Sequence, residues 1–179
     1  MNALTQAALD IARGFVGVRE TGGNNRGPEI EAWLRRVGQP PGVSWCMAFA
    51  WCCVDDAFRK LSLPNPIRPG ASVVRMWHAL PDEAKLTAPA PGLWAFHEDA
   101  DHPGLGHVGF IDDLDPAGQG TYSIEGNTNS EGSRTGGGVW RHTPRLRTLA
   151  YWNLGYADYS AVAPLCLDGP DVGDPAATQ

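Results

Sequence analysis

Hydrophobic positions in the first half of the chain recur with the period of α-helices. Glycine, proline and polar stretches separate four such segments, which predict helices over residues 3–17, 28–37, 45–60 and 72–80. The third segment is apolar on all sides from Met47 to Val54, a pattern typical of a buried helix. Ser44 is the expected N-cap of this central helix.

The second half carries the shorter hydrophobic runs that are typical of β-strands. Turn-forming residues bound runs at residues 93–96, 108–111, 122–124, 139–142 and 150–156, and a mobile Gly-rich loop is expected over 126–138. Helices first and strands second predict one α+β domain over residues 1–163, with N-terminal helices packed on an antiparallel sheet. Residues 164–179 lack periodicity and are expected to form a flexible tail.

Charge and hydropathy restrict the class of partner. The 179 residues carry a formal net charge of −6, which argues against nucleic acid as a partner and against attachment to an anionic membrane by bulk charge. No apolar run is long enough to span a membrane, and the N-terminus lacks the pattern of a secretory signal. We expect a monomer made in the cytoplasm, which another system must release or deliver if its substrate lies outside.

The four cysteines do not predict a disulfide framework. Cys46 and Cys53 share a face of the third helix but lie about 10.5 Å apart along its axis, beyond the reach of a disulfide. Cys52 and Cys53 are interpreted as small buried groups. Cys46, near the start of the helix, is different: free backbone N–H groups and the positive end of the helix dipole would favour its thiolate. The alternative is a buried structural cysteine.

A general base and an orienting group could come from the predicted strands. His107 begins a strand and is flanked by Gly106 and Gly109, although a single strand histidine is often structural. Glu125 and Asn127 follow 18 and 20 positions later, which suits the next strand of a hairpin. Either side chain could accept the imidazole N–H and fix its tautomer, and the spacing does not rank the two. Turn formation is their alternative role.

Taken together, several motifs resemble the CHAP family of cysteine, histidine-dependent amidohydrolases and peptidases. They are Trp45-Cys46, Gly106-His107-Val108-Gly109, Ile124-Glu125-Gly126-Asn127-Thr128-Asn129, Gly17-Val18-Arg19-Glu20 with Asn24-Asn25-Arg26-Gly27-Pro28, and Ala90-Pro91-Gly92-Leu93-Trp94-Ala95-Phe96. The resemblance covers roughly residues 5–145; it departs from the family at Leu93, where an acidic residue is common. Each motif alone is weak, whereas their joint order and spacing are specific.

This resemblance implies a papain-like fold of the NlpC/P60 type and hydrolysis of bacterial peptidoglycan. Cys46 would be the nucleophile, His107 the general base and acid, and Glu125 the orienting residue with Asn127 assisting. The bond would be an amide of the stem peptide, the cross-bridge or the lactyl–peptide junction, which makes the protein an endopeptidase or an N-acetylmuramoyl-L-alanine amidase. A phage lysin or a related bacteriolytic enzyme fits these expectations.

Other expectations concern metals, the substrate groove and competing functions. No cofactor and no required metal are expected, because the acidic run that forms a calcium site in some family members is missing before Cys46. Candidate groove residues are Asn24, Asn25, Trp45 and Trp77, for which a solvated loop or core packing is the alternative. The competing functions are a non-catalytic wall-binding or virion structural module with the same fold, and a thiol acyltransferase.

Overall fold

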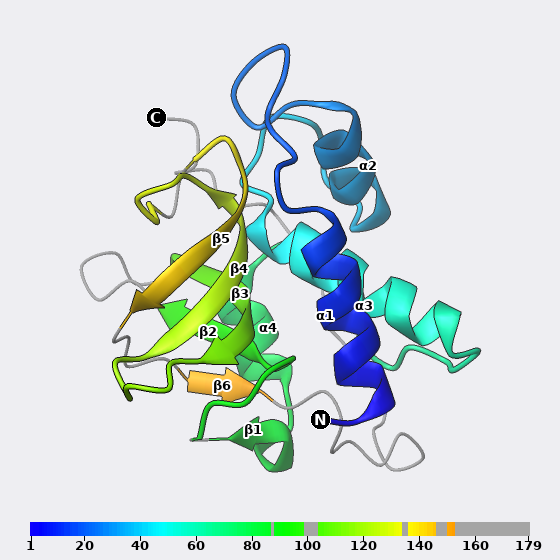
Figure 1. The fold of residues 1–179 in the computed structure, drawn as a ribbon. Helices are drawn as coiled ribbons and strands as arrows, with labels where there is room; N and C mark the ends of the chain where they lie inside the picture. The colour runs from blue at the N-terminus through cyan, green and yellow to red at the C-terminus, as the bar shows by residue number, and fades with distance from the viewer. Residues whose placement is uncertain (87, 99–103, 134–135, 146–149, 153–179) are drawn as a thin grey trace.

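A computed structural model describes the chain except residues 87, 99–103, 134–135, 146–149 and 153–179. The expected tail over 164–179 and Cys166 therefore lie outside the described residues. The fold is α+β, with helices that precede most of an antiparallel sheet, as the order of hydrophobic patterns predicted. Figure 1 shows α1, α2 and α3 grouped to one side of the sheet.

The described helices follow the predicted segments closely. They are α1 (Ala3–Gly14), α2 (Pro28–Arg36), α3 (Cys46–Lys60), α4 (Val73–Ala79) and the 3₁₀ helix η1 (Asp82–Ala84). A capping box between Asn2 and Thr5 starts α1, and Ser72 caps α4. Pro28 occupies the first turn of α2, and Gly38 follows this helix with a φ of 76°.

The prediction of Ser44 as the N-cap of α3 is wrong. The helix begins at Cys46, its N-cap is Trp45, and no side chain caps it. The Trp45 indole is fully buried and donates to Glu20 instead, so burial of this ring fixes how the chain enters the helix. Cys46 is consequently the first helical residue, where backbone N–H groups have no partner within the helix.

The described strands form one six-stranded antiparallel sheet in the order β1-β6-β2-β3-β4-β5. Their bounds are β1 (Lys85–Leu86), β2 (Trp94–Glu98), β3 (Gly106–Leu114), β4 (Thr121–Thr128), β5 (Gly138–Arg145) and β6 (Ala150–Trp152). Strand β4 continues through Thr128, so the loop expected from residue 126 starts later. The two-residue strand β1 was not predicted, because two residues carry no periodicity.

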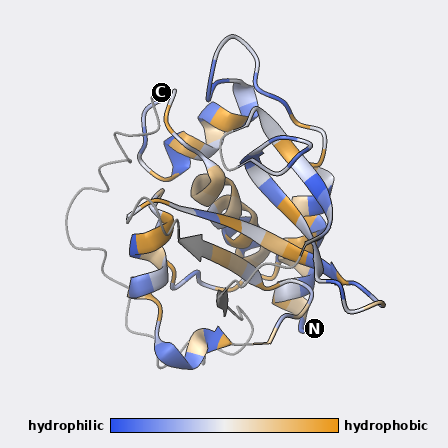
Figure 2. Ribbon diagram, turned by 90° about the vertical axis from the view of Figure 1, so that its left-hand side faces the viewer, coloured by the Kyte–Doolittle hydropathy of each residue, from blue (hydrophilic) through white to orange (hydrophobic). Residues whose placement is uncertain are grey.

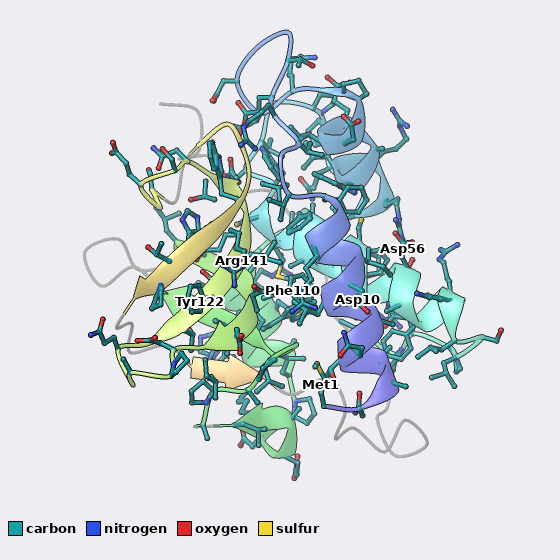
Figure 3. All side chains as sticks on the ribbon, viewed as in Figure 1. Met1, Asp10, Asp56, Phe110, Tyr122 and Arg141 are labelled. Carbon is teal, nitrogen blue, oxygen red and sulfur yellow. The ribbon has the colours of Figure 1, made fainter. Side chains whose placement is uncertain are left out.

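The main core lies between α3 and one face of the sheet. The helix is buried on nearly all sides, and the Phe49 ring on it contacts Trp33, Trp45 and Phe110, the last with ring centroids 6.3 Å apart. Figure 3 shows Phe110 between the sheet and the helices. Hydrophobic and hydrophilic residues alternate along the strands (Figure 2), as expected for a sheet with one face on this core.

Gly126 allows α3 to pack closely against β4. A Cβ at this position would lie 2.8 Å from ring atoms of both Phe49 and Trp45. Any larger residue would push the helix away from the strand, because such contacts are shorter than van der Waals separation. The glycine between Glu125 and Asn127 is therefore required by packing, and it brings the start of α3 close to the strand that carries Glu125.

Candidate active site

Cys46 lies at the first position of α3, at the sheet end of the central helix. The residue is 5% exposed, and it is a free thiol, as are Cys52 and Cys53. Burial raises the pKa of Cys52 to about 12 and the pKa of Cys53 well above its usual value, so both thiols stay neutral at physiological pH. These two cysteines fit the predicted role of small buried groups.

His107 and Glu125 form a buried contact between neighbouring strands. The His107 Nε2 lies 3.0 Å from the Glu125 Oε2, and each residue is 3% exposed. Since Nε2 is engaged with the carboxylate, Nδ1 is the ring nitrogen left for Cys46. This Nδ1 is buried and has no hydrogen bond of ordinary length, but Cys46 is near enough to act on the ring electrostatically.

The protonated form of His107 is strongly favoured. Burial by itself lowers the pKa of His107, but its interactions with Cys46 and with the Glu125 carboxylate outweigh burial and raise the pKa to about 9. The arrangement can therefore hold an imidazolium between Cys46 and a carboxylate. The thiolate form of a cysteine is the nucleophile in thiol catalysis.

Gly109 explains how the Glu125 side chain reaches His107. The two Cα atoms of Gly109 and Glu125 face each other across β3 and β4, and His107 lies two residues earlier on β3, on the same face. A Cβ on Gly109 would lie 2.5 Å from the Glu125 Cγ and 2.9 Å from the Ile124 carbonyl oxygen. The side chain of Glu125 thus passes over the glycine, which accounts for the second glycine of Gly106-His107-Val108-Gly109.

We expect Gly109→Ala to damage both stability and the contact between His107 and Glu125. The added methyl group overlaps backbone and side chain, which typically costs about 1–3 kcal/mol. Chemical denaturation measures this loss. Gly14→Ala is the matched control, because a Cβ on Gly14 meets nothing within 4 Å; it should leave stability the same or slightly higher. Equal stability of the two variants would show that the sheet accommodates the methyl group.

Ser123 and His142 join the site, although the sequence did not single them out. The Ser123 hydroxyl donates to Glu125 Oε1 at 2.6 Å, and His142 Nε2 lies 3.9 Å from Glu125 Oε2. Both residues are buried, and their Cα atoms face each other across β4 and β5. Period-2 alternation from Glu125 would have identified Ser123, but no sequence signal gives the register that brings His142 beside it.

Asn127 makes no hydrogen bond to His107 in the part of the chain described. The residue is buried, adopts a left-handed backbone with a φ of 57°, and its carbonyl oxygen accepts the Gly136 N–H. A left-handed position is one that asparagine tolerates better than most residues. Of the two residues that the spacing could not rank, Glu125 is the one that contacts the imidazole.

The four candidate groove residues do not line one surface. Asn24 is exposed, whereas the Asn25 side chain is buried and donates to the Gly42 carbonyl at 3.3 Å, joining two loops. Trp45 is fully buried, so its prediction as a groove wall is corrected: the indole is part of the core. Trp77 is half-buried and packs against Phe96, with the two ring centroids 5.3 Å apart.

Glu20 also bears on the position of Cys46. Its Oε1 accepts the Trp45 indole N–H at 3.0 Å, and its backbone N–H bonds the Gly137 carbonyl. The neighbouring Arg19 pairs with Gly138 of β5, and its guanidinium stacks 3.6 Å from the Trp140 ring centroid. The stretch Gly17-Val18-Arg19-Glu20 therefore connects β5, at one edge of the sheet, to Trp45, the residue that precedes Cys46.

One pocket among the described residues lies away from Cys46. No group of three or more His, Cys, Asp or Glu among them is placed to hold a metal ion. A pocket of about 360 Å³ lies farther along α3, lined by Trp51, Asp55, Asn65 and residues 66–69, and so does not include Cys46. Asp55 there accepts hydrogen bonds from Arg36, Arg59 and Asn65, which marks a structural network.

No protein-family model, no curated protein and no solved structure matches this chain. Within the described ranges, no helix has both the length and the apolar character needed to cross a membrane.

Proposed function

We propose that this protein is a cysteine hydrolase that cleaves an amide bond of bacterial peptidoglycan. The observation that carries the hydrolase chemistry is the buried set Cys46, His107 and Glu125, in which Cys46 and the Glu125 carboxylate raise the pKa of the histidine between them. The substrate class rests on the resemblance of the sequence motifs to the CHAP family. A papain-like arrangement is part of the same proposal, supported by a nucleophile at the start of a helix packed on a sheet.

The proposed reaction has two halves. The Cys46 thiolate attacks the carbonyl carbon of the amide, and the His107 imidazolium donates its proton to the leaving amine, which produces a thioester on Cys46. Water, deprotonated by His107, then attacks the thioester and releases the acid and the thiol. The Cys46 backbone N–H, at the first position of α3, is available to donate to the oxyanion of each tetrahedral intermediate.

Glu125 holds the imidazole in the tautomer and orientation that this chemistry needs. Its Oε2 accepts from Nε2, so the proton that moves in the reaction is carried on Nδ1. Because Cys46 and His107 come from different halves of the chain, the site requires the packing of α3 against the sheet. Gly126 allows that packing, and Gly109 leaves room for the Glu125 side chain to reach His107.

The proposal is tested by digestion of purified peptidoglycan followed by mass spectrometry of the fragments. A free lactyl group on the sugar identifies an N-acetylmuramoyl-L-alanine amidase, whereas a new stem-peptide or cross-bridge terminus identifies an endopeptidase. Intact peptidoglycan after incubation with folded protein, together with a Cys46 that does not react with iodoacetamide below pH 8, would support the non-catalytic module instead. Product formed only when an acyl acceptor is added would support the acyltransferase.

We expect chelation of divalent metal ions to leave hydrolysis unchanged. The proposed steps use only a thiolate, an imidazole and backbone N–H groups, so removal of metal ions should cost less than about twofold. Turbidity loss of purified sacculi with and without EDTA measures this, and a calcium-dependent hydrolase in the same buffer provides the positive control. A large loss that calcium restores would place a metal requirement in this protein.

A further inference from the structure

The Glu125 carboxylate has buried polar neighbours at both of its oxygens, and these come from the sheet. Oε1 accepts the Ser123 hydroxyl at 2.6 Å, while Oε2 lies between His107 Nε2 at 3.0 Å and His142 Nε2 at 3.9 Å. The four residues are each at most 8% exposed. The carboxylate is thus held by groups on β3, β4 and β5.

The register of the sheet places these groups on one face. Ser123 precedes Glu125 by two residues on β4, so their side chains share a face, and His142 faces Ser123 across the β4–β5 pair. The residue directly across from Glu125 on β5 is Trp140. The side chain opposite Glu125 on β5 is therefore a neutral aromatic ring. The polar groups shown to contact the carboxylate from β4 and β5 are Ser123 and His142.

We propose that Ser123, backed by His142, is a positioning residue that keeps Glu125 Oε2 directed at His107. This inference rests on the proposed function of the Cys46–His107 pair, whose third member it supports. The Ser123 hydroxyl fixes the rotation of the carboxylate, because a donor on Oε1 leaves only Oε2 turned toward β3. His142 closes the other side of Oε2 and restricts the carboxylate from swinging toward β5.

Two titratable side chains among the described residues are shown in contact with Glu125. His107 contacts it from β3 and His142 from β5, and Cys46 on α3 acts on it through His107. Neighbouring charges are engaged elsewhere: Arg141 bonds Asp112 and lies 4.5 Å from the Tyr122 ring centroid, and Arg19 stacks on Trp140. Figure 3 shows Arg141 beside Tyr122 on the sheet. A change in the ionisation of His107 on loss of Ser123 would therefore report the orientation of Glu125.

The test is an NMR titration of the His107 imidazole in the full chain, with its signals assigned by their absence in His107→Gln. The pKa of His107, about 9 in the parent protein, should fall by about 0.5–1 unit in Ser123→Ala, because the carboxylate then turns part of the time away from the ring. Ser123→Thr keeps the hydroxyl and should restore the parent value. His142→Gln should give a smaller fall, because its contact is longer than a hydrogen bond.

Two controls separate positioning from general destabilisation. Ser72→Ala removes the hydroxyl that caps α4, so it should lower stability without moving the pKa of His107. In a Glu125→Gln background, Ser123→Ala should cause no further shift, since no carboxylate charge is left to orient.

The proposal is overturned by an unchanged pKa of His107 in Ser123→Ala, by a further shift in the Glu125→Gln background, or by a rise in His142→Gln. That last result would mean that His142 competes with His107 for Oε2. The NMR titration needs no substrate, so its result can reject the positioning role of Ser123 independently of whether the protein hydrolyses peptidoglycan. A shifted pKa in a protein that leaves peptidoglycan intact would reject the proposed function and keep the positioning role.

Discussion

Replacing Cys46 by alanine is expected to reduce hydrolysis to background, a loss of about 10⁴-fold or more, while the fold remains intact. The reason is that no other described thiol can replace it: Cys52 and Cys53 are buried in the middle of α3, and burial keeps both thiols protonated. The sulfur of Cys46 is small, so its removal should cost about 1 kcal/mol of stability. Turbidity loss of purified sacculi measures activity, and circular dichroism confirms folding.

Cys53→Ala is the matched control for this prediction. It removes the same group from the same helix, in a fully buried position seven residues farther along α3. Its cost should fall on stability through a small cavity, with turnover largely retained, and Cys52→Ala should behave in the same way. Undiminished hydrolysis in Cys46→Ala, or a loss of equal size in Cys53→Ala with the fold intact, would refute the assignment of the nucleophile.

The helices were predictable because their hydrophobic periods are long and their ends carry strong local signals. Pro28 and Gly38 bracket α2, and the all-apolar run from Met47 to Val54 could only be a buried segment. The failure at Ser44 has a tertiary cause. Local capping preference favoured serine, but the buried Trp45 indole and its bond to Glu20 decided where α3 begins. Capping preferences consider only neighbouring residues, so they do not take account of a contact with a residue as distant in the sequence as Glu20.

The candidate site was predictable only as far as residue type and strand spacing reach. A histidine at the start of a strand and a carboxylate near the end of the next could be expected to meet, and His107 and Glu125 do. The spacing did not rank Glu125 against Asn127, because a bulge between Glu125 and Thr128 changes the register at that point. Ser123 and His142 were missed for a related reason: the partner strand and its register are set by the whole sheet.

Trp45 was assigned a role in the substrate groove that its burial contradicts. An aromatic residue beside a candidate nucleophile suggested a groove wall, but its ring lies among Trp33 and Phe49, with centroids 5.6 and 6.5 Å away. Burying such a ring contributes strongly to stability, since aromatic side chains remove a large apolar area from water. The position next to Cys46 is therefore occupied by a residue that anchors the helix start, which keeps the thiol in a fixed place.

The second large effect is expected for Glu125→Gln, which should lower kcat and move the basic limb of the pH–rate profile to lower pH. The Glu125 carboxylate favours the imidazolium form and so helps to raise the pKa of His107 to about 9. Glutamine keeps the shape and removes the charge, so the pKa of His107 should fall by about one unit, as loss of a close opposite charge typically does. The imidazolium that protonates the leaving amine is then lost at lower pH.

Asn127→Gly is the control that separates charge from backbone conformation. Alanine at this position would be strained by the φ of 57°, whereas glycine adopts that conformation freely, so the glycine variant removes the side chain alone. It should lower kcat modestly and leave the basic limb in place, because Asn127 is neutral and makes no bond to His107 among the described residues. The profile of kcat/KM against pH for both variants decides between the two residues. If Asn127→Gly moves the limb and Glu125→Gln does not, the charge that sustains the imidazolium does not come from Glu125, and the contact at 3.0 Å serves only to orient the ring.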